Sequence, residues 1–145
     1  MWRESARDRR LCLDLPPVSL WVWADERAVV TVLGNLIDNA LKYSYPDTEV
    51  RVSAASVDGS AVIAVHNHGP AIAPEHQPRL FERFYRVDRS DSRRVYGFGL
   101  GLYIARKLVE GMDGRIWVVS EPTNGTRFAF TAPLVKEDQL ETADR

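Results

Sequence analysis

The chain has 145 residues with 19 basic and 20 acidic side chains, so its formal net charge is −1 when histidine is neutral. This length corresponds to one domain, which should bury roughly 70% of its unfolded surface without disulfide or metal support. A composition of 45% hydrophobic and 27% charged residues excludes disordered, collagen-like and coiled-coil chains, and the balanced charge lacks the basic excess typical of nucleic-acid binders.

Membrane insertion and disulfide chemistry are also disfavoured. No apolar run approaches the ~20 residues that a membrane span needs, and the N-terminus lacks the apolar core of a signal peptide. The single cysteine, Cys12, excludes an internal disulfide or a cysteine-based zinc site and favours a reducing compartment. We interpret Cys12 as a small packed residue of a strand.

The first half of the chain is predicted to contain two strands and a long helix. Residues 1–10 are charged and aperiodic, and are interpreted as a linker remnant. Alternating leucines predict a strand over 11–15, and a second short strand is expected over 20–23. Asp25 is expected to cap a helix that runs to about Tyr43.

The second half is predicted to contain two hairpins, two helical segments and a charged tail. The hairpins cover 50–65, with a turn at Asp58-Gly59, and 115–132, with a turn at Asn124-Gly125. A helix-like stretch lies at 74–84, a glycine-rich segment opens a helix at 97–112 that Gly114 is expected to close, and 136–145 form the tail. The order of elements predicts an α/β two-layer fold, with one sheet and helices on one face.

The long helix carries a polar stripe beside its apolar face. Asn35, Asn39 and Lys42 fall within about 60° of one another on a helix, flanking the apolar face. That face is formed by Val29, Val32, Leu33, Leu36, Ile37 and Ala40. Amide oxygens are acceptable ligands for Mg²⁺, and an ammonium group suits phosphate, so the stripe favours a hydrated cation with a polyphosphate. A solvated polar face is the alternative.

Two glycine-containing loops are further candidates. Residues 97–103 place alternating glycines before a helix, where backbone N–H groups can approach an anion. A Rossmann site is disfavoured because no strand immediately precedes these glycines, and the P-loop pattern is absent. In the loop 66–72, Asn67 can present its amide to a heterocycle, whereas His66 and His68 are interpreted as exposed loop residues, not a metal pair.

Five segments together resemble one family. Residues 35–44 resemble the N-box of sensor histidine kinases, 67–72 the first glycine box, 80–86 the F-box, 97–102 the second glycine box and 125–128 the closing G-T-x-F strand. The resemblance covers 25–134 in order. It implies a Bergerat-type ATP-binding domain over 11–135, with a mixed, mostly antiparallel sheet and about three helices on one face.

The resemblance also implies roles for individual residues. Asn39 would coordinate Mg²⁺ between the phosphates of ATP, and Asn35 and Lys42 would contact phosphate or ribose; these three are the expected catalytic residues. The segment 86–96 corresponds to a mobile ATP lid. The full expected ATP-binding set is Asn35, Asn39, Lys42, Tyr43, Asn67, Gly69, Ala71, Ile72, Arg83, Phe84, Arg86, Gly97, Phe98, Gly99, Leu100, Gly101, Leu102 and Thr126.

The sequence departs from the family pattern at three positions. The family usually has an aspartate in place of Asn67, and this aspartate accepts a hydrogen bond from the adenine amine. An asparagine oxygen can still accept that bond but lacks the negative charge, which weakens the interaction by ~1 kcal/mol. Ala71 replaces a glycine and requires a backbone without positive φ, and Phe98 replaces a polar residue. These departures motivate an alternative, a degenerate nucleotide-binding or docking module without kinase activity. Another member of the same superfamily, such as a topoisomerase, mismatch-repair or chaperone ATPase, is a third class, but these need a glutamate base in the N-box helix, where this chain has Asn35 and Asn39.

The histidine that would accept phosphate is not found in this chain. His66, His68 and His76 do not resemble the family's acceptor box. The predicted function is therefore transfer of the γ-phosphoryl of Mg-ATP to a histidine on a separate dimerisation domain of the same parent protein, for relay to a response-regulator receiver domain. Alone, the chain is expected to be a cytoplasmic monomer that does not autophosphorylate and contacts neither nucleic acid nor membrane. Its parent kinase would be cytoplasmic or anchored in the bacterial inner membrane.

Overall fold

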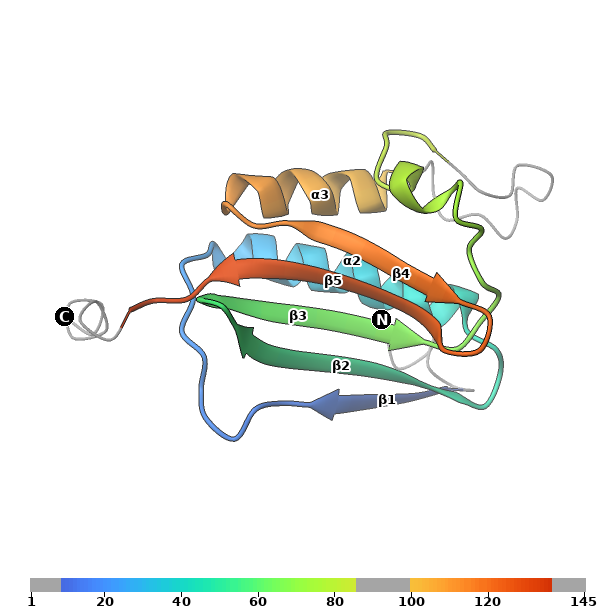
Figure 1. The fold of residues 1–145 in the computed structure, drawn as a ribbon, viewed down its shortest axis with the longest axis horizontal. Coiled ribbons are helices and arrows are strands. Elements are labelled where there is room, and N and C mark those ends of the chain that lie inside the picture. The colour runs from blue at the N-terminus through green and yellow to red at the C-terminus, as the bar shows by residue number, and fades with distance from the viewer. Residues whose placement is uncertain (1–8, 86–99, 137–145) are drawn as a thin grey trace.

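The computed structural model describes residues 9–85 and 100–136, which form a five-stranded sheet with two α-helices on one face (Figure 1). The strands are β1 (Arg9–Asp14), β2 (Thr48–Val57), β3 (Ser60–Asn67), β4 (Ile116–Glu121) and β5 (Gly125–Pro133). The helices are α2 (Glu26–Tyr43), α3 (Gly101–Gly111) and the short 3-10 helix η1 (Gln77–Arg79). In the described part of the chain, no helix is long and apolar enough to span a membrane.

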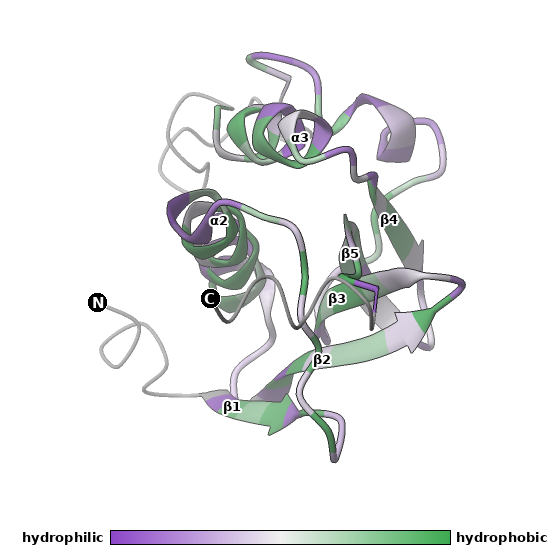
Figure 2. Ribbon diagram, turned by 90° about the vertical axis from the view of Figure 1, so that its left-hand side faces the viewer, coloured by the Kyte–Doolittle hydropathy of each residue, from purple (hydrophilic) through white to green (hydrophobic). Residues whose placement is uncertain are grey.

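The sheet is mixed but mostly antiparallel, as predicted. Its strand order is β1-β2-β3-β5-β4, and only β1 and β2 run parallel. Because both α-helices pack on one face, the two-layer α/β prediction is confirmed (Figure 2).

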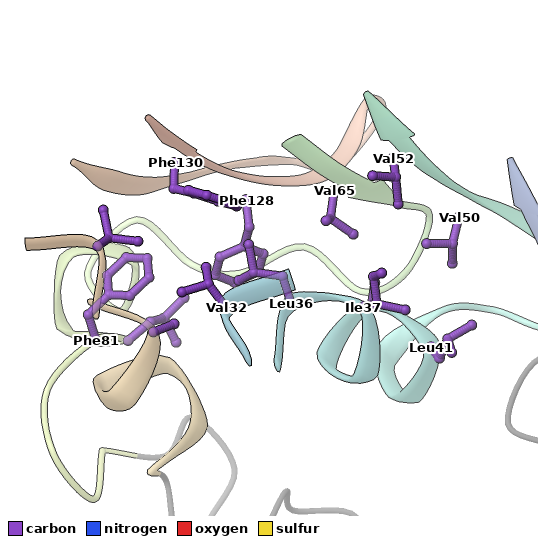
Figure 3. Packing of buried hydrophobic residues seen from close by; sticks show 14 residues of the cluster. Val32, Leu36, Ile37, Leu41, Val50, Val52, Val65, Phe81, Phe128 and Phe130 are labelled. Carbon is purple, nitrogen blue, oxygen red and sulfur yellow. The ribbon is translucent and has the colours of Figure 1, made fainter. Parts of the chain in front are cut away.

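Helix α2 forms where the sequence predicted it. The Asp25 carboxylate accepts a hydrogen bond from the Ala28 N–H at 3.1 Å, which satisfies one of the unpaired donors of the first turn. The apolar face is buried against the inward side chains of the sheet, with Phe128 and Val65 packing over Leu36 (Figure 3). Core residues thus extend along α2 as far as Leu41, two residues before the helix ends.

The two predicted turns between strands are confirmed. Asp58 and Gly59 both have positive φ, at 49° and 83°, which matches the twist of a two-residue hairpin. Gly125 has φ 81° at the start of β5 and leads the chain out of the turn after β4.

The end of α3 differs from the prediction. The residue with the left-handed backbone is Asp113, at φ 59°, and not Gly114. Gly114 instead donates its N–H to Val109 O at 3.0 Å, and a Cβ there would lie 2.0 Å from Thr131 O. Glycine is therefore required here by close packing against β5, and not by its conformational freedom.

The strand predicted over 20–23 is wrong. This segment makes one bridge, between Val22 and Leu134, with hydrogen bonds from Trp23 N to Pro133 O and from Val135 N to Trp21 O. Pro133 has no N–H to return to the segment, so the ladder cannot continue.

The helix predicted over 74–84 is also wrong. Only Gln77–Arg79 is helical, as a 3-10 turn, and the N–H groups of Arg79, Glu82 and Tyr85 each bond to a carbonyl three residues earlier. Pro78 lacks the N–H that an α-helix needs at that position, and Phe84 at φ 65° ends the run.

Candidate functional site

A row of polar side chains lies on the helix-covered face of the sheet, where the apolar core ends. In the strand register Asn67 pairs with Thr126, and Thr126 pairs with Ser120. The next row inward is apolar and consists of Val65, Phe128 and Val118. Asn67 and Thr126 are 3% and 4% exposed, so the polar row is built into the interior of the site.

Ser120 ties the loop after β3 to the sheet. Its hydroxyl lies 2.7 Å from Thr126 Oγ1 and accepts the Ile72 N–H at 2.9 Å. The Gln77 amide then donates to Ile72 O and Ser120 O at 2.8 and 3.2 Å. Sequence reasoning missed Ser120, although the turn at Asn124-Gly125 sets the register that places it opposite Thr126.

The Asn67 amide is available to a ligand. No other described residue makes a hydrogen bond with this side chain, although the residue is 3% exposed. Among the described residues, Arg106 Nε is the side-chain polar atom that is both fully enclosed and without a hydrogen-bond partner. The Asn67 side-chain amide is not fully enclosed in this way, so it stays accessible from the site. A buried amide without a partner is costly unless a ligand or water pairs with it.

The loop after Asn67 lies directly on the end of α2. Tyr45 N donates to His68 O at 2.8 Å, and a Cβ on Gly69 would lie 2.0 Å from Tyr43 O. Ala71 does not have positive φ, as its side chain requires. The loop after β3 and the C-terminal end of α2 are therefore held together by backbone contacts.

The polar stripe of α2 faces the start of α3. The Asn35 side-chain N–H donates to Gly101 O at 2.9 Å and so attaches the first residue of α3 to α2. Asn39 lies one turn further along, half-buried, and no other described residue hydrogen-bonds its amide. Lys42 follows on the exposed surface. The stripe therefore runs from the α3 N-terminus towards the loop after β3.

The remaining predicted residues divide into three groups. Leu102 and Ile72 pack against the core, and Leu100 precedes α3. Arg83 and Phe84 are exposed, with the guanidinium 4.8 Å from the centre of the ring. Arg86, Gly97, Phe98, Gly99 and the predicted lid at 86–96 lie outside the described residues.

A separate hollow of about 490 Å³ lies between η1, α3 and β4. It is lined by Pro74, Gln77, Pro78, Phe81, Arg106, Ile116, Trp117 and Val118, and none of these belongs to the predicted ATP-binding set. No group of three or more histidine, cysteine, aspartate or glutamate residues in 9–85 and 100–136 is arranged to hold a metal ion.

Comparison with known proteins gives a consistent result. Residues 24–136 match the family described as histidine kinase-, DNA gyrase B-, and HSP90-like ATPase. The chain is 36% identical over 129 residues to the sensor-like histidine kinase SenX3 of Mycolicibacterium smegmatis, covering 89% of this chain and 34% of that protein. It thus spans about a third of the length of this curated relative.

Solved structures agree. The mycobacterial sensor histidine kinase MprB superposes with a TM-score of 0.78 at 28% identity, covering 92% of this chain and 87% of that one. Full-length ShkA, solved in complex with AMPPNP, superposes with a TM-score of 0.76 at 29% identity, covering 92% of this chain and 27% of that one. The fold is that of histidine kinase catalytic domains.

Proposed function

Because this chain belongs to the family of histidine kinase-, DNA gyrase B- and HSP90-like ATPases, we propose that it is the ATP-binding catalytic domain of a sensor histidine kinase. ATP would lie between the polar row of the sheet, the stripe of α2 and the start of α3. The relatives are longer than this chain, so the acceptor domain and the sensor would belong to the rest of a parent protein.

The single observation that carries the proposal is the Asn67 amide, which has no hydrogen-bond partner among the described residues and lies beside buried Thr126. An amide oxygen can accept a hydrogen bond from the N6 amine of adenine, and Thr126 can support the same edge of the base through water. Full-length ShkA, part of which has this fold, was solved in complex with AMPPNP, which supports nucleotide binding by a domain of this kind.

Magnesium fits the stripe only together with the nucleotide. Asn39 offers one amide oxygen, and Mg²⁺ is commonly held by few protein ligands plus phosphate oxygens and water. When bound, the ion would neutralise charge on the phosphates. Lys42 and the remaining Asn35 oxygen would contact phosphate or ribose, while Arg83 would reach towards the γ-phosphate from the F-box.

The proposed reaction transfers the γ-phosphoryl group to a histidine supplied by the dimerisation domain of the parent protein. In phosphoryl transfer the protein mainly positions the groups and stabilises charge, which is what an amide and ammonium stripe provides. His66 and His76 hydrogen-bond to Asn124 and Tyr85 within this chain, which disfavours either of them as the acceptor. The phosphoryl group would then pass to a response-regulator receiver domain, with the ATP-binding domain in the cytoplasm.

Titration of the chain with Mg-ATP, followed by calorimetry, tests the proposal. We expect saturable binding below millimolar ATP, a weaker affinity for Mg-GTP, and phosphorylation of an added dimerisation domain but not of the chain itself. No binding at millimolar Mg-ATP would overturn the proposal and favour the degenerate docking module.

Replacing Asn67 with aspartate is expected to tighten ATP binding a few-fold, about 1 kcal/mol, because the carboxylate accepts the N6 amine with charge assistance. Calorimetry with ATP and with inosine triphosphate, which lacks that amine, measures the effect. The gain should disappear with inosine triphosphate. An equal gain for both nucleotides would assign Asn67 a role other than contact with the adenine amine.

A further inference from the structure

The two edge strands of the sheet, β4 and β1, differ in the hydrogen bonds that they make to the rest of the chain. At the β4 edge, Ser120 O accepts a hydrogen bond from the Gln77 side chain at 3.2 Å, and the Ser120 hydroxyl accepts from Ile72 N, so the loop and η1 are bonded to this strand. At the opposite edge, no segment in the described ranges other than β2 makes a backbone hydrogen bond to β1. An open edge strand presents a row of unpaired N–H and C=O groups that can pair with another strand.

The helix-facing side of β1 is apolar and uncovered. Leu11 and Leu13 are in register with Val50 and Val52, so all four side chains point to the same face of the sheet. Val50 and Val52 are 0% and 7% exposed, but Leu11 and Leu13 are 39% and 65% exposed. Figure 2 shows β1 at the margin of the sheet, beyond the part that α2 covers.

The face of β1 that points away from the helices carries two opposite charges, which lie at equal distances on either side of Cys12. Arg10 and Asp14 stand two residues before and two residues after Cys12. The Asp14 carboxylate is only loosely held within the chain, at 4.0 Å from the Arg51 guanidinium, because Glu49 binds that guanidinium at 2.7 Å. Asp14 can therefore accept a second cation.

We propose that β1 is a self-pairing surface, which joins two copies of this chain by antiparallel pairing centred on Cys12. In that register Arg10 faces Asp14 of the second copy and Leu11 faces its Leu13, so both faces of the strand are matched at once. Directly opposed residues of antiparallel strands lie on the same face, and opposite charges or apolar side chains in these positions stabilise the pair. The open backbone groups of both edges are satisfied together.

Other registers do not match in this way. If the two strands were centred on Leu11, Arg10 of one copy would face Cys12 of the other. If they were centred on Leu13, Cys12 would face Asp14, so neither register brings opposite charges together. A six-residue edge forms a small interface of the weak and transient class. The monomer expected from the sequence is then the state of dilute protein, and pairing appears at high local concentration.

Charge reversal tests the pairing directly. Sedimentation velocity over a concentration series should give a dissociation constant about tenfold higher for Asp14→Arg and for Arg10→Asp, because each places like charges opposite each other in both symmetric pairs. The double variant Arg10→Asp/Asp14→Arg should return to within about twofold of the wild type. A double variant as weak as the single ones, or a wild type monomeric at millimolar concentration, would overturn the proposal.

Cys12 provides a second readout, since it is the single cysteine of the chain. Opposed Cα atoms in antiparallel pairs lie about 4.5–5.5 Å apart, within the range of disulfides. Oxidation with copper-phenanthroline and oxygen should thus give a disulfide-linked dimer, in which two Cys12 thiols release two protons and oxygen takes up the two electrons. Asp14→Arg should suppress this dimer. The hydrogen bond to the Glu49 carboxylate raises the pKa of the Cys12 thiol, so the oxidation is best done at alkaline pH.

Matched variants on the two edges complete the test. Leu13→Ser should weaken the dimer, whereas Val119→Ser, on exposed β4, should leave it unchanged. If Val119→Ser weakens association and Leu13→Ser does not, β4 is the interface and the proposal fails. Mg-ATP affinity should stay constant in Asp14→Arg, so the outcome is independent of the nucleotide site.

Discussion

Replacing Asn39 with alanine is expected to abolish Mg²⁺-dependent ATP binding while leaving the chain folded. The Asn39 amide makes no hydrogen bond with another described residue, and no cluster of acidic or histidine side chains in those ranges can take its place as a ligand. Loss of the amide oxygen should weaken Mg-ATP binding at least about 100-fold, or ~2.7 kcal/mol. Stability should change little, because the side chain is half-buried and alanine favours a helix.

Calorimetry with ATP in Mg²⁺ and in EDTA measures this effect. The wild type and Asn39→Ala should bind metal-free ATP with similar, weak affinity and differ only when Mg²⁺ is present. Thr31→Ala, an exposed position of the same helix, is the control and should bind Mg-ATP like the wild type. An unchanged Mg-ATP affinity in Asn39→Ala would refute the assigned role.

Replacing Gly69 with alanine is expected to destabilise the chain by about 2–3 kcal/mol and to weaken ATP binding. An added Cβ would lie 2.0 Å from Tyr43 O, which is a backbone atom and cannot move out of the way as a side chain does. The same Cβ would lie 3.2 Å from the Asn67 amide nitrogen, so the loop must shift beside Asn67, where we propose that the base binds.

Urea denaturation followed by tryptophan fluorescence measures the loss. Gly111→Ala is the matched control, because a Cβ there meets nothing within 4 Å and the residue is the last of α3. That variant should be as stable as the wild type or gain up to ~1 kcal/mol. If both variants unfold at the same urea concentration, the contact between the loop and α2 does not constrain the chain.

The elements that were predicted correctly depend on local signals. The apolar stripe of α2, its cap at Asp25 and the turn at Asp58-Gly59 are each determined by residues a few positions apart. The Asn35, Asn39 and Lys42 stripe follows from helical spacing alone, whereas its nucleotide role stays a prediction that rests on the joint resemblance of five segments.

The features that were missed depend on contacts between distant residues. Gly114 follows α3 in sequence, but the residue must be glycine because Thr131 O of β5 lies where a Cβ would be. Ser120 lies in an unremarkable strand pattern, and its importance comes from bonding to Ile72, 48 residues away in sequence. The alternating leucines of β1 predicted a strand, but only the position of α2 determines that Leu13 remains exposed. Such packing is not encoded in any short window.

The hydrogen bond from Asn35 to Gly101 O requires a side-chain N–H donor at position 35. An aspartate at 35 has no N–H to donate, so its carboxylate would face the carbonyl oxygen without a proton between them. A carboxylate at position 35 would therefore leave Gly101 O without its donor and loosen the start of α3, so Asn35 acts here as an anchor between the two helices.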